Sequence, residues 1–223
     1  MPKLAYQCEY LGQFISGDSA VFTNTKACIG SYQVQKDREV VIAIDWGANT
    51  GNDDTAITIG QFYDDKIRIE KIITFNNKTT NATIGIILNT VTSYVNQGIK
   101  DITIMVETNS IGNIYYSLLV EAVEEYQVRY NEYVNYKNEI DITIGRFTTT
   151  NSSKKRIVEQ LATLFENEHI IIPDDNKLIS QLTTFECKIE KSGLVTYNAA
   201  SGFHDDIIIS LAICTDYLWN NIS

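Results

Sequence analysis

The sequence has few of the residues that build zinc sites, disulfide frameworks or flexible linkers. Its 223 residues include four cysteines, two histidines and two prolines. No cysteines form a C-x-x-C pair and the histidines, His169 and His204, lie far apart, which argues against structural zinc. We expect reduced, non-catalytic thiols, with Cys214 in an apolar helical pattern as a core residue. No Pro-rich or Gly/Ser-rich tract divides the chain, whose length suits one well-packed domain.

Long apolar runs and positive charge are also scarce. No run approaches the ~18–20 residues of a membrane span, and the first ten residues lack a signal-peptide core. We therefore expect a cytoplasmic protein that is neither secreted nor in a membrane. Lysine and arginine number 18 against 28 acidic residues, a formal net charge of −10. This argues against tight non-specific nucleic-acid binding by this chain alone, although another domain can supply the grip.

Hydrophobic patterning predicts a mixed α/β domain. The continuous apolar run 40–45 is typical of a strand buried on both faces, and two alternating β-branched runs follow, so three consecutive strands predict an antiparallel meander. Further strands are predicted at 101–107, 141–147 and 169–173, and helices at 81–97, 113–126, 204–219 and within 148–167, where capping residues come first. The segment 176–199 predicts a helix followed by a hairpin that turns at 192–193. This order predicts a mixed β-sheet flanked by helices on both faces.

Two helices have predicted inward faces. The spacing in 113–126 places Leu118, Leu119 and Val123 toward the core. The last helix presents one apolar face that includes Ile208, Leu211 and Trp219.

Four acidic residues stand where the predicted elements meet. Asp45 closes the first buried strand, Glu107 closes the strand at 101–107, and Asp205 with Asp206 opens the last helix. Acids at strand ends and at a helix N-terminus can converge at one edge of a sheet, which is unfavourable unless something pairs with them. A divalent cation is a suitable partner for carboxylate oxygens. Two such cations about 4 Å apart catalyse phosphodiester cleavage, so these four acids are the candidate catalytic and metal-binding residues.

Each acid also has an ordinary structural explanation. Asp45 in "DWG" can be a turn residue, and Glu107 precedes what can be an ordinary loop. Asp205 and Asp206 can stabilise the helix dipole, and His204 can cap the same helix. The ordered combination favours a metal site.

Four segments in order resemble the motifs of one family. "AIDWGANTGNDDTAITIG", "IMVETNSIGN", "TTNSSKKRIVEQLATLFENEHIIIP" and "GFHDDIIISLAIC" look like the successive motifs of the large terminase nuclease domain of tailed phages, over residues 38–218. "CEYLGQF…AVF" near the N-terminus resembles the segment that joins the terminase ATPase to its nuclease. By this resemblance, residues 1–38 are a linker and 39–223 form an RNase H-like nuclease domain.

The resemblance implies roles for individual residues. Asp45 would bridge two Mg²⁺ or Mn²⁺ ions and Glu107 would hold the second, while the principal ligand of the pair Asp205 and Asp206 stays open. Asp54 and His204 would be auxiliary. The residues expected to meet the DNA backbone are the basic run at a helix start, Lys154, Lys155 and Arg156.

The implied function is an endonuclease that cuts concatemeric viral DNA during genome packaging in the host bacterial cytoplasm. Its implied partners are double-stranded DNA, the terminase ATPase domain, the small terminase and the portal. No G-x-x-x-x-G-K-[ST] phosphate loop occurs, so we do not expect this chain to be the motor. It would be an excised domain or a separately encoded nuclease.

Three alternatives use the same residues differently. Another RNase H-like nuclease, such as a RuvC-type junction resolvase, would need similar acids. "DWGANTG" also resembles the first phosphate loop of an actin-like or sugar-kinase-like ATPase, but "ETNSIGN" is a poor second loop and the chain is short for two lobes. A non-catalytic interaction module is the third alternative.

Overall fold

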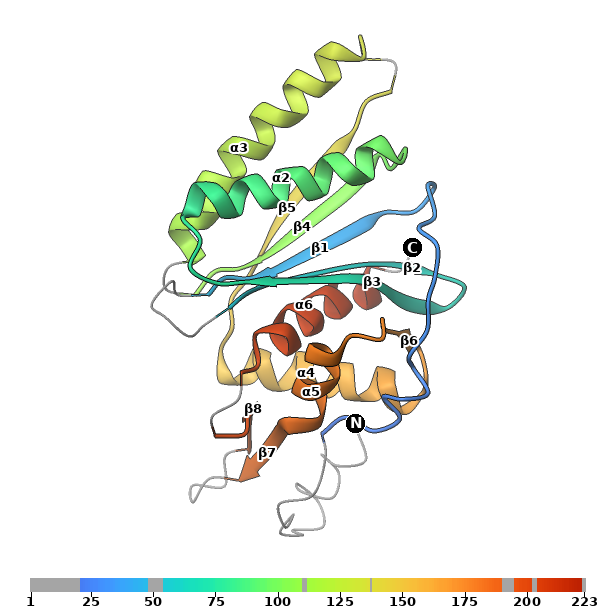
Figure 1. Cartoon of the computed structure of the whole chain (residues 1–223), viewed down its shortest axis with the longest axis vertical. Coiled ribbons are helices and arrows are strands. Elements are labelled where there is room, and N and C mark those ends of the chain that lie inside the picture. Colours follow the sequence, from blue (N-terminus) through green and yellow to red (C-terminus); the bar gives the residue numbers. More distant parts are fainter. Residues whose placement is uncertain are drawn as a thin grey trace.

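A six-stranded sheet forms the centre of the molecule (Figure 1). The computed structural model describes residues 21–47, 54–109, 112–136, 138–189, 195–201 and 204–221. The strand order is β5–β4–β1–β2–β3–β6. Their bounds are β1 Val40–Asp45, β2 Thr55–Tyr63, β3 Lys66–Phe75, β4 Asp101–Glu107, β5 Asp141–Phe147 and β6 Ile170–Ile171.

The strand directions confirm the predicted meander. β1, β2 and β3 pair antiparallel, whereas β4 is parallel to β1 and β5 is parallel to β4. The short β6 adds in parallel to β3. Parallel strands place their carboxyl ends at the same edge, so β1, β4 and β5 all finish on one side of the sheet.

Strand β1 contributes to both hydrophobic cores of the domain. Val41 and Ala43 face the core beneath α6, while Val40, Ile42 and Ile44 face the opposite core. All five side chains are fully buried. A central strand covered on both faces must be apolar at every position, which explains the continuous run in the sequence.

Helices cover the two faces of the sheet (Figure 1). α2 (Thr80–Asn96) and α3 (Gly112–Tyr133) lie on one face, and α4 (Asn151–Glu166), α5 (Asn176–Thr184) and α6 (Asp206–Asn220) lie on the other. β7 (Phe185–Ile189) and β8 (Val195–Ala199) pair antiparallel, as the predicted hairpin requires, and the predicted turn at 192–193 lies outside the described residues. Within the described part of the chain, no helix is both long and apolar enough to cross a membrane.

Helix α6 is buried more completely than predicted. Every residue from Ile207 to Thr215 is buried, because the helix packs on β1 and β2 while α4 and α5 contact it from outside. The single inward face predicted from the sequence is therefore only part of its apolar contact. Enclosure on several sides fixes the direction of the helix N-terminus, where Asp205 and Asp206 lie.

Helix α3 is more exposed than predicted. It continues to Tyr133, and Leu118, which we expected to face the core, is 42% exposed. Only a narrow stripe that includes Leu119 and Val123 is buried, because α3 lies over the last strands of the sheet, β4 and β5. The large apolar side chains that are exposed in the described residues all belong to α3 and the turn after it: Ile114, Leu118, Val128, Tyr133 and Tyr136.

Residues 21–38 of the predicted linker pack onto the domain. The ring of Phe22 lies 5.7 Å from that of Phe165 and 5.5 Å from that of Phe185 between centroids. Val21 is buried in the same core, and Ile29 forms a β-bridge with Ile172. Val21, Phe22 and Cys28 thus belong to the domain's core, and residues 1–20 of the predicted linker lie outside the described residues.

Candidate active site

The ends of β1 and β4 and the start of α6 meet at one edge of the sheet. Ile44 pairs with Val106 in the parallel register, so the next residues, Asp45 and Glu107, end neighbouring strands together. Asp205 is the N-cap residue of α6 and Asp206 is its first helical residue. Since α6 packs on β1 and β2, its N-terminus adds two further acids to this edge.

The pKa of Asp45 responds to the three other acids at this edge. The pKa of the Asp45 carboxyl is raised well above its ordinary value, first by burial and then by Glu107, Asp206 and Asp205 in that order. The positive charge of Lys154 lowers it. Asp45 keeps some accessible surface at the strand end, although protein surrounds its carboxylate. A buried acid among three others is unfavourable without a cation, and such perturbed groups mark functional sites.

The chemistry of this acid cluster suits a hard divalent cation. Asp45, Glu107, Asp205 and Asp206 offer only carboxylate oxygens, which Mg²⁺ and Mn²⁺ prefer. As their side chains stand, no three His, Cys, Asp or Glu residues in the described ranges converge closely enough to hold one ion. The acids are thus near enough to shift a pKa but would need side-chain rotation to coordinate.

Lys154 lies within the acid cluster. Its Nζ is 2.8 Å from Asp205 Oδ2 and 3.0 Å from Asn198 Oδ1. The basic run predicts that this lysine meets the DNA backbone, whereas in the structure it contacts one candidate metal ligand, Asp205.

The other two members of the basic run face elsewhere. Lys155 Nζ lies 3.9 Å from Glu159 Oε1 on the same helix. The Arg156 guanidinium donates to both carboxylate oxygens of Asp216, which ties α4 to α6. Successive helical residues point about 100° apart, so this run does not form one continuous basic surface.

The two auxiliary residues differ in their distance from the cluster. His204 Nδ1 is 3.9 Å from Asp206 Oδ2, and its side chain is 46% exposed, which places it at the mouth of the site. The Asp54 carboxylate forms an ion pair with Lys177 at the start of α5. Lys177 also donates to Thr74 Oγ1 over 3.0 Å. Asp54 is therefore held by a structural contact between β2, β3 and α5.

The sequence analysis did not identify two residues near the acids, Gly112 and Asn198. A Cβ atom on Gly112 would lie 2.4 Å from the backbone oxygen of Glu107, so the first residue of α3 must be glycine for the helix to approach this strand end. The glycine five residues after Glu107 was a signal for such a close approach. Asn198 on β8 gave no signal, because its nearness to Lys154 depends on how the β7–β8 hairpin lies against α4.

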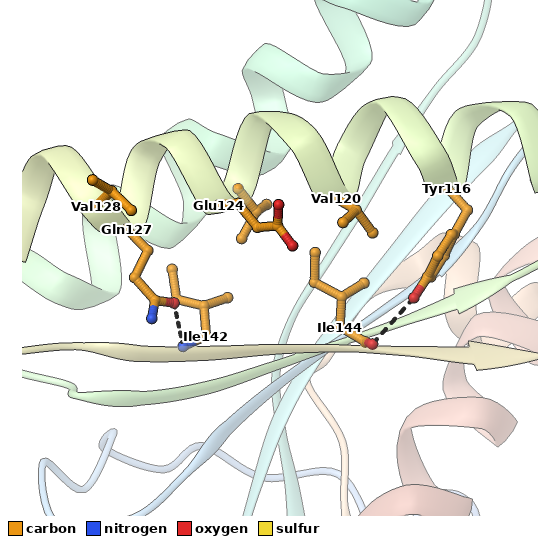
Figure 2. A pocket seen from close by; sticks show the side chains of 8 residues that line it. Tyr116, Val120, Glu124, Gln127, Val128, Ile142 and Ile144 are labelled. Carbon is orange, nitrogen blue, oxygen red and sulfur yellow. Dashed lines mark hydrogen bonds between the residues drawn. The ribbon is translucent and has the colours of Figure 1, made fainter.

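A groove lies away from the acids, between α3 and β5 (Figure 2). It has a volume of about 400 Å³ and a mostly apolar lining in which Glu124 is the only acid. The hydroxyl of Tyr116 donates to Ile144 O over 3.3 Å, and the Ile142 N–H donates to Gln127 Oε1 over 2.9 Å. This groove lacks a set of groups for hydrolysis, so the acid cluster remains the candidate active site.

The strand order and directions define the RNase H-like fold, with candidate acids at the ends of β1 and β4. Within that class, the chain resembles the large terminase nuclease of thermophilic phage G20c, solved with magnesium and with cobalt: each comparison gives a TM-score of 0.67 and 18% identity over 90% of this chain and 98% of that one. The nuclease domain of the Thermus phage P74-26 large terminase gives 0.66 and 16% identity over 92% and 98%.

A longer solved protein has a similar fold over half of its length. The large terminase of another thermophilic bacteriophage gives a TM-score of 0.66 and 10% identity, and the match covers 98% of this chain but 50% of that one. No protein-family model and no curated protein sequence matches the chain. These likenesses show that the chain has the RNase H-like fold of large terminase nuclease domains.

Proposed function

We propose that this protein is a divalent-metal-dependent DNA endonuclease of the large terminase type. The observation that carries the proposal is the buried Asp45 carboxylate, acted on by Glu107, Asp206 and Asp205 at one edge of an RNase H-like sheet. The magnesium-bound and cobalt-bound nucleases of similar fold support it.

The four acids have distinct places in this proposal. Asp45 is the central ligand, and Glu107 and Asp206 are the acids whose charges affect it most. Asp205, which Lys154 contacts, completes the set. Bound Mg²⁺ or Mn²⁺, as a pair, would activate water and stabilise the leaving oxygen of the phosphodiester.

The protein's own groups prepare the site for that chemistry. Burial and the neighbouring acids raise the pKa of Asp45 in the metal-free protein, and a bound cation would favour its charged form. His204, exposed at the mouth, would contact a backbone phosphate of the substrate. α6, buried between the sheet and α4, keeps Asp206 in a fixed position.

The biological role that fits is cleavage of concatemeric viral DNA during packaging in the host bacterial cytoplasm. The partners in this proposal are double-stranded DNA, a terminase ATPase domain, the small terminase and the portal. The longer large terminase is about twice the length that this chain matches, which supports a second domain tethered to this one. Arg156 forms an ion pair with Asp216, and Lys154 forms one with Asp205. The domain therefore offers few cations to DNA and would rely on partners to bring the DNA to it.

A plasmid-cleavage assay tests the proposal. The wild type should nick or cut supercoiled plasmid in Mn²⁺ or Mg²⁺ and spare it in EDTA, and Asp45→Asn should abolish cleavage. Asp101→Asn is the matched control, because Asp101 is exposed at the opposite end of the strand that carries Glu107. Cutting in EDTA, or an Asp45→Asn variant as active as the control, would contradict the mechanism.

The same protein preparation discriminates the alternatives. A four-way junction cut in preference to linear duplex would favour a resolvase. Hydrolysis of ATP without DNA cleavage would favour the kinase-like ATPase.

A further inference from the structure

Lys154 is the cation whose charge acts on Asp45, and its place in the acid cluster is well defined. Its ammonium group contacts Asp205 on α6 and Asn198 on β8, so it joins three elements. Its side chain is 20% exposed and that of Asp205 is 28% exposed. Its charge opposes the effect of the surrounding acids on Asp45.

The position of Lys154 is fixed by the start of α4. The Thr150 side chain accepts from the Ser153 N–H, and the Ser153 hydroxyl accepts from the Thr150 N–H, which forms a capping box. Lys154 follows directly, in the first turn of the helix. A cation there is disfavoured by the helix dipole, so helix stability does not explain this lysine. Its contacts with Asp205 and Asn198 do.

We propose that Lys154 is a built-in counter-ion that competes with the divalent metal for Asp205 and thereby sets the metal affinity of the site. The inference rests on the proposed function. Lys154 is a positioning residue in this scheme, since it acts through the Asp205 carboxylate.

Lys154 can give up Asp205 to a metal ion because its ammonium group has a second acceptor, Asn198. Without metal, the ammonium ion offsets part of the repulsion among the acids and holds Asp205 toward α4. A divalent cation that draws Asp205 toward Asp45 displaces the ammonium, which keeps its contact with Asn198.

Substitutions of Lys154 and of Asn198 should shift the affinity for Mn²⁺ in opposite directions. Lys154→Met removes the competitor, so the Mn²⁺ concentration at half-maximal stabilisation should fall by about threefold or more, and the metal-free protein should melt at a lower temperature. Asn198→Ala removes the second acceptor and leaves the ammonium on Asp205, so the Mn²⁺ midpoint should rise. Asn198 is exposed, and its loss should not disturb folding.

The experiment is a thermal-shift titration with MnCl₂ in the absence of DNA. Lys155→Met is the matched control, because it removes the same charge one residue away, where the lysine lies near Glu159. Its midpoint should equal that of the wild type, and Lys154→Arg, which keeps the charge, should stay close to it.

The outcomes separate the two proposals. If the wild type is stabilised by Mn²⁺ and cuts DNA, but Lys154→Met has the same or a higher midpoint than Lys155→Met, the counter-ion inference is wrong and the proposed function stands. A rise for Asn198→Ala alongside a fall for Lys154→Met supports the inference. If Mn²⁺ neither stabilises the wild type nor supports cleavage, the proposed function itself fails.

Discussion

Replacing Asp45 by asparagine should stabilise the metal-free protein while it abolishes metal-dependent cleavage. Asparagine keeps the size of the side chain and removes the charge that burial and three neighbouring acids disfavour. Most substitutions at partly buried positions destabilise a fold, so a gain in stability is a distinctive expectation.

The gain in stability from Asp45→Asn follows from the charges around Asp45. Two unit charges roughly 8 Å apart repel by about 2 kcal/mol at an effective dielectric constant of about 20. Asp45 has three acidic neighbours and one cationic neighbour, so repulsion exceeds attraction. After allowance for solvent screening, we expect a gain of about 2 kcal/mol, which for a domain of this size raises Tm by about 4–8 °C.

The gain should depend on pH in a defined direction. The pKa of Asp45 is raised in the folded protein above the ordinary value of 3.8. The charged form is thus penalised only in the fold, so the wild type loses stability as pH rises from the unfolded to the folded pKa. The stabilisation by Asp45→Asn should therefore be full above the folded pKa and vanish below the ordinary value.

The assay is thermal unfolding in EDTA between pH 4 and 9, followed by titration with Mn²⁺. Asp54→Asn is the matched control, because it makes the same chemical change but removes the ion pair with Lys177, so it should lower Tm. Mn²⁺ should raise the Tm of the wild type much more than that of Asp45→Asn. An Asp45→Asn protein that is less stable than the wild type at pH 8, or equally stabilised by Mn²⁺, would refute the reasoning.

Three further outcomes are expected. Asp206→Asn should remove more of the Mn²⁺-induced rise in Tm than Asp205→Asn, because Asp206 affects Asp45 more strongly; equal losses would contradict this ranking. Gly112→Ala should lower stability by about 1–3 kcal/mol and reduce cleavage, because its Cβ meets the backbone of Glu107; an unchanged Tm and activity would show that the strand end adjusts freely. Binding of a short duplex in Ca²⁺ should show a slope of log affinity against log salt of about −2 to −4, with Arg146, which stacks on Tyr116, among the few available cations. A steep slope with submicromolar affinity would reveal a basic surface that we have missed.

The sheet and the meeting of the acids were predictable from local patterns. The continuous apolar run before Asp45 and the similar run before Glu107 identify buried strands, and a parallel pair brings their ends together. The capping pattern at the start of α6 then places two acids at a helix N-terminus. Each step needs only periodicity and general topology.

Features that depend on how elements dock were not predictable in the same way. Lys154, Lys155 and Arg156 are equivalent in sequence, and only the rotation of α4 against α6 decides which one meets an acid of the cluster. The exposure of Leu118 similarly depends on where the sheet ends beneath α3. Apolar spacing predicts a face on a helix, but it does not tell how wide the surface beneath that face is.

Helix α3 also protects the edge of the sheet that β5 forms. An edge strand offers backbone groups to which a strand of another molecule can add. Gln127 accepts from the Ile142 N–H and Tyr116 donates to the Ile144 carbonyl, so α3 occupies two of these groups (Figure 2). Sheet extension across molecules at this edge would first require displacing both side chains. The domain can thus expose an apolar helix to its surroundings with less risk of strand-to-strand aggregation, and a molecule that binds there must recognise side chains.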